Sequence, residues 1–417
     1  MSERFEAVYL IETAWPLEEA AASMAGEQSS GTFVPVPGET PELRARSGAR
    51  VELIEELGEL AAPSLSGASR PGGSVIRQAR VILSWPVTNI GPSLPNLIAT
   101  VAGNLFELSA FSGLRLQDVR LSDSFARAYP GPRFGVEGTR RLSGVKEGPL
   151  IGTIIKPSVG LSTDGTAEMV DQLVHAGIDF IKDDELQSDG PNCPFDDRAR
   201  AVMARINDYA ERTGKKVMFA FNLTGEIDEM RRRHDLVRDL GGTCVMISLN
   251  SVGMSGFLGL SRHCELPIHA HRNGWGALSR HPALGWSFPA WAKLWRMAGA
   301  DHMHVNGLAN KFCEPDESVV ASARDCLTPI FADKPCIAMP VFSSGQTARQ
   351  APDTFAALGS ADLIHAAGGG IMAHPEGPAA GVTAFREAWD AAMTGESLAE
   401  RAWQSPELAR ALGGVSK

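Results

Sequence analysis

The sequence has no apolar run long enough to cross a membrane, because no stretch approaches about 20 consecutive apolar residues. Met1–Phe5 leads into a polar segment, without the basic start and apolar run of a secretory signal peptide. The net charge of −10 argues against nucleic acid or an anionic membrane surface as the main partner. We therefore expect a cytoplasmic protein, in which a local cationic pocket can still bind a small anion.

Cysteine is scarce and scattered. The 6 cysteines include no Cys-x-x-Cys pair, so the sequence lacks the pattern of a zinc site or a disulfide-stabilised secreted domain. We expect reduced thiols, several of them buried. The cysteines are Cys193, Cys244, Cys264, Cys313, Cys326 and Cys336.

The length of 417 residues suits a barrel of about 250 residues with an added domain of about 130. In the first part of the chain, strand-like and helix-like segments mix without a regular order. We predict an N-terminal α+β domain of ferredoxin-like type over residues 1–135 and a second domain over residues 136–417. The segments behind this prediction are strands over 6–12 and 75–85, a helix over 17–26 and a connector over 129–135.

From residue 150 onward, short apolar runs alternate with helix-compatible segments. Strands that alternate with helices form parallel βαβ units, and eight such strands form a closed barrel. An open doubly wound sheet is the alternative, but it normally has about six strands and carries a glycine fingerprint after the first, which is missing here. We therefore predict an α/β fold with a (β/α)8 barrel and C-terminal helices. The eight runs begin near Ile151, Ile178, Val217, Thr243, Leu266, Asp301, Cys336 and Asp362.

The carboxyl ends of these predicted strands are unusually polar, and barrel enzymes bind their substrates at this end. One polar residue there is unremarkable, but a purely structural barrel does not need them at nearly every strand end. The residues are Lys156, Lys182, Asp183, Asp184, Glu185, Asn222, Asn250, His271, Arg272, His302, His304, Asn306, Ser343, Ser344 and Gly368–Gly370.

The strongest local signal is the hexapeptide Phe180–Glu185. Its three adjacent carboxylates repel one another unless a cation lies among them, and oxygen ligands of this kind suit Mg²⁺. A solvated acidic turn, in which Lys182 pairs with its neighbours, explains the hexapeptide equally well. The residues alone leave both interpretations open.

This hexapeptide resembles the metal-site motif of ribulose bisphosphate carboxylase (RuBisCO) and its relatives. In that family the lysine amine captures CO₂ as a carbamate, which binds Mg²⁺ together with an Asp and a Glu. The resemblance implies that Lys182 is carbamylated and binds Mg²⁺ with Asp184 and Glu185. A buried lysine beside a metal site can have a lowered pKa, which keeps its amine neutral and nucleophilic.

Further segments resemble the family in the same chain order. Residues 152–157 resemble the first-strand motif, whose lysine exchanges protons with the substrate and is here Lys156. Residues 343–345 and 368–370 resemble two loops whose backbone N–H groups hold phosphate, although a Gly-Gly-Gly run taken alone is more often a flexible turn. The resemblance implies a substrate site formed by His271, Arg272, His304, Lys311, Ser343, Gly345, Gly369 and Gly370.

Two other histidines of the barrel fit structural roles. His302 is equally well explained as a core histidine. His269 shares a strand face with His271 but lies two residues further from the carboxyl end, so we expect it to be structural.

The N-terminal part also resembles the family. Residues 26–33 resemble its Glu-x-x-x-Gly-Thr-Trp segment, with Phe33 in place of Trp, and residues 103–106 resemble its Gly-Asn-x-Phe segment. In the family both segments reach into the active site of a neighbouring subunit. The resemblance therefore implies a homodimer or dimer-based oligomer in which Glu27, Thr32 and Asn104 contact the substrate.

Three departures argue against carboxylation of ribulose bisphosphate. Ser158 stands where carboxylating members have a second lysine, and Trp275 stands where they have a second histidine. The mobile loop after the sixth strand, normally Gly-Lys-Leu-Glu-Gly around a CO₂-holding lysine, reads Asn-Lys-Phe-Cys at residues 310–313, so that Lys311 aligns in an altered context.

What the resemblance retains is the half-reaction in which Mg²⁺ acts as an electron sink and Lys156 protonates an enediolate. Gly-Glu-Gln-Ser-Ser-Gly-Thr-Phe, and the Asn-Gly-Trp-Gly after Arg272, are similar to members that degrade branched sugar acids. We therefore predict a lyase that decarboxylates 3-oxo-isoapionate 4-phosphate to L-erythrulose 1-phosphate and CO₂.

Several alternatives to the decarboxylase stay open. Within the family they are a transcarboxylase/hydrolase acting on the same sugar acid, the methionine-salvage enolase and the 5-methylthioribulose 1-phosphate isomerase. An isomerase needs a second base, which Ser158 does not easily supply. The non-enzymatic alternative is a sugar-phosphate sensor, but a sensor has no use for a carbamate-built metal site.

Overall fold

The computed structural model describes residues 3–31, 36–70 and 74–413, and these divide into two compact units. The first unit comprises Met1–Pro130 and Gly274–Met297, and the second comprises Gly131–Asn273 and Ala298–Lys417. The return of residues 274–297 to the first unit has no counterpart in the sequence prediction. The domain boundary after residue 135 stays a prediction.

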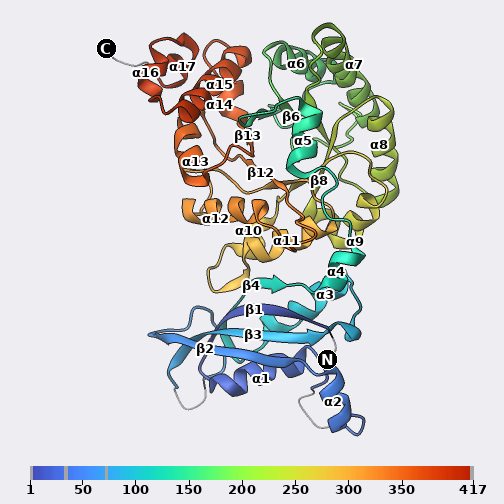
Figure 1. Ribbon diagram of the computed structural model, residues 1–417, viewed down its shortest axis with the longest axis vertical. Coiled ribbons are helices and arrows are strands. Elements are labelled where there is room, and N and C mark those ends of the chain that lie inside the picture. The colour runs from blue at the N-terminus through green and yellow to red at the C-terminus, as the bar shows by residue number, and fades with distance from the viewer. Residues whose placement is uncertain (1–2, 32–35, 71–73, 414–417) are drawn as a thin grey trace. The chain divides into compact units, whose positions relative to one another are not determined.

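The first unit is built on a mixed sheet with the strand order β10-β4-β1-β3-β2, of which β1 to β4 are labelled in Figure 1. The strands β1 to β4 pair antiparallel in the ferredoxin-like order, with α1 and α3 as the crossover helices. The strands are β1 (Arg4–Thr13), β2 (Arg50–Leu60), β3 (Ile76–Pro86), β4 (Phe111–Arg120) and β10 (Leu284–Trp286). The helices are α1 (Leu17–Glu27), α2 (Pro41–Ser47), η2 (Val87–Asn89), α3 (Leu94–Val101), η3 (Leu105–Glu107), α4 (Asp123–Ala128), α10 (Trp275–Ser279) and α11 (Phe288–Ala298).

The central strand β1 illustrates why this sheet forms. Its sequence is rich in aromatic and β-branched residues, and Phe5, Tyr9 and Ile11 are fully buried. The Tyr9 hydroxyl donates a 2.6 Å hydrogen bond to the carbonyl of Val101 at the end of α3. This bond satisfies the polar end of a buried side chain and ties the helix to the sheet.

The strand β10 comes from the excursion between two barrel strands and pairs parallel with β4. Arg115 stabilises this addition, because its guanidinium donates to the carbonyls of His281 and Leu284, both at 2.9 Å. The three-residue strand β10 therefore covers the edge of β4 that would otherwise stay unpaired.

The second unit is the predicted barrel, and all eight of its strands are confirmed. They are parallel and close in the order β11-β12-β13-β5-β6-β7-β8-β9, with β9 paired to β11. The strands are β5 (Leu150–Ile154), β6 (Phe180–Lys182), β7 (Met218–Asn222), β8 (Cys244–Ser248), β9 (Ile268–His271), β11 (His302–His304), β12 (Met339–Phe342) and β13 (Ile364–Ala366).

Helices alternate with these strands and surround them (Figure 1). The long helix α7 shows how the sequence sets their limits: Asp196 and Asp197 lie in its first turn, and Gly214 ends it in the left-handed conformation with φ of 76°. The helices are α5 (Gly135–Ser143), α6 (Thr163–His175), α7 (Phe195–Thr213), α8 (Ile227–Asp239), α9 (Leu249–Ser261), α12 (Asp316–Leu327), η4 (Ala348–Gln350), α13 (Ala351–Leu358), α14 (Gly368–Met372), α15 (Pro378–Thr394), α16 (Leu398–Ala402) and α17 (Pro406–Ala411).

Apolar side chains from the barrel strands fill its interior, so the barrel is a packed core and leaves the chemistry to the strand ends. The fully buried members of this core are Leu150, Phe180, Met218, Ala220, Cys244, Met246, Met339, Val341, Ile364 and Ala366.

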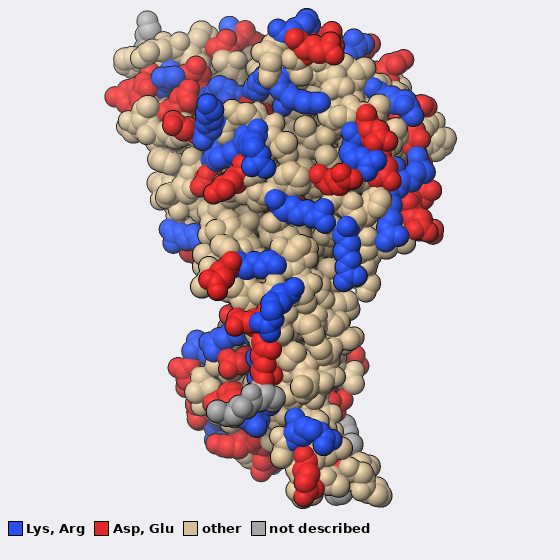
Figure 2. Space-filling model, turned by 45° about the vertical axis from the view of Figure 1, so that its right-hand side comes forward, with Lys and Arg blue, Asp and Glu red and all other residues tan. Residues whose placement is uncertain are grey.

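The surface and the thiols agree with the composition. All 6 cysteines are free, and Cys313 alone is exposed. On the face shown in Figure 2, described Lys and Arg side chains and described Asp and Glu side chains are both spread over the surface. None of the described helices is both long and apolar enough to span a membrane.

Asp301 is a buried carboxylate that joins three segments of the barrel. Its Oδ1 accepts from the N–H groups of Phe134 and Gly135 at 2.7 and 2.9 Å, and its Oδ2 accepts from Ile268 N–H at 2.9 Å. We predict that Asp301→Asn lowers the free energy of unfolding by about 2–3 kcal/mol, because the new amide N–H₂ meets a backbone donor. Urea unfolding measures this change.

The matched control is Asp208→Asn, which removes the same charge from the surface of α7. The Asp208 carboxylate is 64% exposed and forms a 2.9 Å ion pair with Arg212. We expect a change below about 0.5 kcal/mol in this variant. Equal losses in the two variants would contradict the role assigned to Asp301.

Candidate active site

The carboxyl ends of β5, β6, β9, β11 and β12 carry polar side chains that contact one another across the barrel. The contacts run from Lys156 after β5 to Asp184 after β6, and from Glu185 to His271 on β9. They continue between the ends of β9, β11 and β12, described below. Most of the residues selected from sequence therefore meet at one end of the barrel.

Lys182 ends β6 with its side chain fully buried, and its Nζ donates a 2.7 Å hydrogen bond to the carbonyl of Asp183. Glu185 Oε2 lies 3.8 Å from the same Nζ. Burial lowers the pKa of Lys182, against the raising effect of Glu185, Asp184 and Asp183. A buried amine with a lowered pKa beside two carboxylates is the donor set that a carbamate-assisted Mg²⁺ site needs.

Asp183 has a different role from its two neighbours. Its Oδ2 accepts from Asn222 N–H at 3.0 Å and from Arg198 at 3.3 Å, and neither Asp183 nor Arg198 is exposed. Burial raises the pKa of Asp183, while Arg198 lowers it. The charge of Asp183 is therefore matched by an arginine, and Asp184 and Glu185 remain as the candidate ligands.

Asp184 lies between the candidate metal site and Lys156. Lys156 Nζ donates to Asp184 Oδ2 at 2.5 Å and to Ser158 Oγ at 2.8 Å. Burial raises the pKa of Asp184, but the hydrogen bonds from Lys156 and from Leu186 N–H outweigh this effect and leave the pKa lowered. Ser158 thus helps to orient the Lys156 amine.

Three histidines and a serine continue the site across β9, β11 and β12. His269 Nε2 lies 2.8 Å from His304 Nε2, and His304 Nδ1 lies 3.1 Å from Ser343 Oγ. His271 Nε2 lies 3.5 Å from Glu185 Oε2. Burial and the charge of Lys182 lower the pKa of His271 to about 4, although Glu185 raises it.

This arrangement changes what His304 offers to a ligand. Because both of its ring nitrogens are engaged within the protein, His304 orients Ser343 in this state. His269, which sequence reasoning set aside as structural, is the partner on the other side of His304. His302 contacts Thr139 Oγ1 at 2.8 Å and lies fully buried, in agreement with a core histidine.

Arg272 has a partner that the sequence did not indicate. Its guanidinium lies 2.5 Å from Glu314 Oε2, and Asn306 Nδ2 donates to the same oxygen at 2.7 Å. Glu314 lies in the irregular segment between β11 and α12, where no periodic pattern marks it. The two residues are 42 positions apart, so their pairing could not be predicted from the sequence.

The loops predicted to hold phosphate lie beside Lys156 and Lys311. A Cβ atom added to Gly368 would lie 3.5 Å from Lys156 Cε, and one added to Gly345 would lie 3.5 Å from Lys311 Cβ. Gly345 also has φ of 82°, which favours glycine. Lys311 N–H donates to the carbonyl of Ser344 at 3.3 Å, so the backbone at Lys311 contacts this loop. A Cβ on Gly369 would meet open space.

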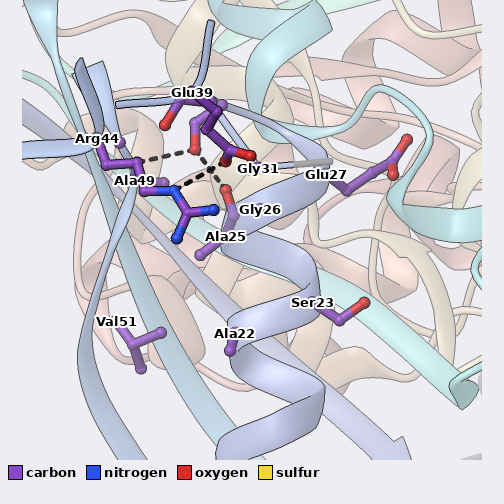
Figure 3. Close-up of a pocket in the computed structure, with 13 residues that line it drawn as sticks. Ala22, Ser23, Ala25, Gly26, Glu27, Gly31, Glu39, Arg44, Ala49 and Val51 are labelled. Carbon is purple, nitrogen blue, oxygen red and sulfur yellow. Dashed lines mark hydrogen bonds and ion pairs between the residues drawn. The ribbon is translucent and has the colours of Figure 1, made fainter. Parts of the chain in front are cut away.

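Within the first unit, Asn104 Nδ2 donates to Glu27 Oε1 at 3.1 Å, so these two predicted residues are neighbours. Thr32 lies outside the described residues. The end of α1 and the following loop line a pocket of about 450 Å³, formed entirely by residues of the first unit. Figure 3 shows the Arg44–Glu39 ion pair, 3.0 Å long, on its wall, with the Glu27 side chain directed away from that pair.

A second group of potential metal ligands lies on α8 and after α9, at His234, Asp235 and His263. Asp235 Oδ1 contacts both imidazoles, at 3.0 and 2.8 Å. His234 Nε2 accepts from Glu265 N–H at 3.0 Å, so its Nδ1 carries a proton directed at Asp235. This tautomer makes the group a hydrogen-bonded cluster.

The two roles assigned to adjacent carboxylates can be separated. We predict that Asp184→Asn weakens Mn²⁺ binding in bicarbonate buffer at least about tenfold, because it removes a ligand. Asp183→Asn should instead lower the free energy of unfolding by about 3 kcal/mol, because it leaves the Arg198 charge buried and unmatched. Manganese titration followed by electron paramagnetic resonance and urea unfolding provide the two measurements, and the reverse assignment of effects would contradict this geometry.

Comparisons with known proteins agree with this arrangement. The family described as ribulose bisphosphate carboxylase large chain, catalytic domain, matches residues 135–414, and the corresponding N-terminal domain matches residues 7–125. A 3-oxo-isoapionate-4-phosphate transcarboxylase/hydrolase of Xanthobacter autotrophicus is 58% identical over 415 residues, which cover 99% of each chain. A 3-oxo-isoapionate-4-phosphate decarboxylase of Rhizobium rhizogenes is 43% identical and covers 98% of this chain and 97% of its own.

A solved structure extends the likeness to three dimensions. The crystal structure of a RuBisCO-like protein from Burkholderia fungorum superposes with a TM-score of 0.92 at 50% identity, covering 98% of this chain and 99% of the other. The sequence motifs, the two-unit fold and these matches lead to one conclusion: the chain is a RuBisCO-like member of the ribulose bisphosphate carboxylase large-chain family.

Proposed function

We propose that this protein is a transcarboxylase/hydrolase that acts on 3-oxo-isoapionate 4-phosphate. The observation that carries the proposal is the 58% identity, over 99% of both chains, to a protein with that activity. The decarboxylase predicted from sequence has less support, since proteins with that name are 43% identical. It remains the second candidate.

The two reactions share their first half. The substrate is a β-keto acid, so loss of CO₂ from the carbon next to the ketone leaves an enediolate. A decarboxylase protonates that carbon and releases L-erythrulose 1-phosphate. A transcarboxylase/hydrolase returns CO₂ to the former ketone carbon, and one water then cleaves the five-carbon chain into glycolate and a phosphoglycerate.

The proposed Mg²⁺ site uses carbamylated Lys182 with Asp184 and Glu185, whose positions at the end of β6 fit such a site. When bound, Mg²⁺ supplies positive charge that stabilises the enediolate oxygens. Lys156 Nζ, held by Asp184 and Ser158, is the proposed proton donor to the final carbanion in either reaction.

The remaining predicted contacts orient the substrate. Ser343, Gly345, Gly369 and Gly370 offer hydroxyl and backbone N–H groups for the phosphate. The first-unit residues Glu27 and Asn104 contribute from a neighbouring copy in the proposed homodimer.

The first experiment identifies the products by ¹³C NMR of the purified protein with Mg²⁺, bicarbonate and 3-oxo-isoapionate 4-phosphate labelled in the carboxylate. The proposal predicts glycolate and phosphoglycerate, with the label retained in the phosphoglycerate carboxylate. Labelled CO₂ together with L-erythrulose 1-phosphate would establish the decarboxylase in its place.

Lys156→Met keeps the length of the side chain but removes the amine that donates the proton. We predict that this variant lowers kcat by at least about a hundredfold.

Lys311 provides a sharper test, because the aligned lysine of the family holds CO₂. If CO₂ is formed and recaptured in this site, Lys311→Met should let it escape. We predict that the variant releases labelled CO₂ and L-erythrulose 1-phosphate as a rising share of its products, measured by the same NMR assay. Lys146→Met removes an exposed lysine before β5, at the opposite end of the barrel, and should leave the product ratio unchanged.

A further inference from the structure

The cationic side chains at the strand ends have carboxylate partners within the protein. Lys156, which follows β5, lies against Asp184, as described above. Arg272 follows β9, and its guanidinium lies 2.5 Å from Glu314 Oε2. The Arg272 side chain is 8% exposed and that of Glu314 is 15% exposed, so each charge is balanced mainly by the other.

The Glu314 carboxylate is fixed by several donors. Asn306 Nδ2 donates to Oε2 at 2.7 Å, and Ser318 Oγ donates to Oε1 at 2.9 Å. Asn310 Nδ2 donates to the backbone carbonyl of Glu314 at 3.1 Å. The carboxylate therefore takes up donors from the ends of two strands, β9 and β11, and from the start of α12.

The neighbouring histidine adds no positive charge to this end of the site. His304 has both ring nitrogens engaged, with His269 and Ser343, and burial holds its pKa well below the usual range. The described part of the chain shows no ion pair for Lys311, which lies beside Gly345 with its Nζ 5.3 Å from the Phe312 ring centre. Positive charge is therefore unmatched at Lys311 and matched by a carboxylate at Arg272.

From this distribution we infer that Glu314 is a specificity-determining residue that excludes a second phosphate. The carboxylate cancels the charge of Arg272 and occupies donors that a phosphate dianion would need, so a dianion there would meet a like charge in a buried place. The Arg272 end is thereby reserved for a hydroxyl or a singly charged group. This inference rests on the proposed function, in which the substrate carries one phosphate.

The test compares two ligands that differ only in the second phosphate, D-ribulose 1-phosphate and D-ribulose 1,5-bisphosphate. Their dissociation constants are measured by calorimetry on the full-length protein with Mg²⁺ at fixed ionic strength. We expect the native protein to bind the bisphosphate no more than threefold tighter than the monophosphate. Glu314→Gln, which keeps the shape and removes the charge, should tighten bisphosphate binding at least tenfold and change monophosphate binding less than threefold.

The matched control is Asp316→Asn, which removes the same charge from the same segment. Asp316 Oδ1 accepts from Ala309 N–H at 2.8 Å, and its contacts do not include Arg272. In this variant, the ratio of the dissociation constants for the bisphosphate and the monophosphate should equal that of the native protein. If Glu314→Gln unfolds, as its melting temperature would reveal, Glu314→Ala provides the same loss of charge and should give the same gain.

Two results would overturn the inference: native protein that binds the bisphosphate at least tenfold tighter than the monophosphate, or a folded Glu314 variant with an unchanged ratio. Both titrations measure binding without turnover. A failure of the proposed reaction would therefore be seen in the product assay alone, and a failure of this inference in the titrations alone.

Discussion

The buried ion pair between Asp183 and Arg198 fixes the turn on which the candidate chemistry depends. It joins the end of β6 to α7, and the N–H of Asn222 on β7 completes it. With Asp183 held in this way, the next two carboxylates are left for the end of the barrel where Lys156 and His271 lie. Three consecutive acidic residues are thereby divided into one that stabilises the fold and two that are available for a cation.

Charges are also paired at the other strand ends of the site. Lys156 and Arg272 are each held against a carboxylate, and burial lowers the pKa of His269 and His304 well below the usual range. Electrostatic attraction in such a site depends on the few charges that remain unmatched, and the substrate must fit their positions. The acidic overall composition is therefore compatible with an anionic substrate, because the local balance of charge decides binding.

The sequence predicted the barrel because its strands are local features, with short apolar runs that end in polar residues. The polar positions at Lys156, Lys182 and His271 were found for the same reason, since each directly follows a run. Other features depend on distant pairings that leave no local pattern. The three-residue strand β10 is one example, and Glu314 is another, because its role exists only through Arg272. The structural role of Asp183, as opposed to the candidate ligand role of Asp184, likewise depends on Arg198, which is 15 residues away from Asp183.

The excursion that supplies β10 has a consequence for how the chain is made. Arg115 on β4 and its partner Leu284 are separated by 169 residues. On a ribosome, the four strands β1 to β4 emerge long before this partner, and most barrel strands are synthesised in between. The nascent first unit therefore carries an exposed strand edge through much of translation, and edges of this kind recruit other chains. The sheet can be completed only after the fifth barrel strand has been synthesised. Folding of the first unit therefore finishes after synthesis of the second unit has begun.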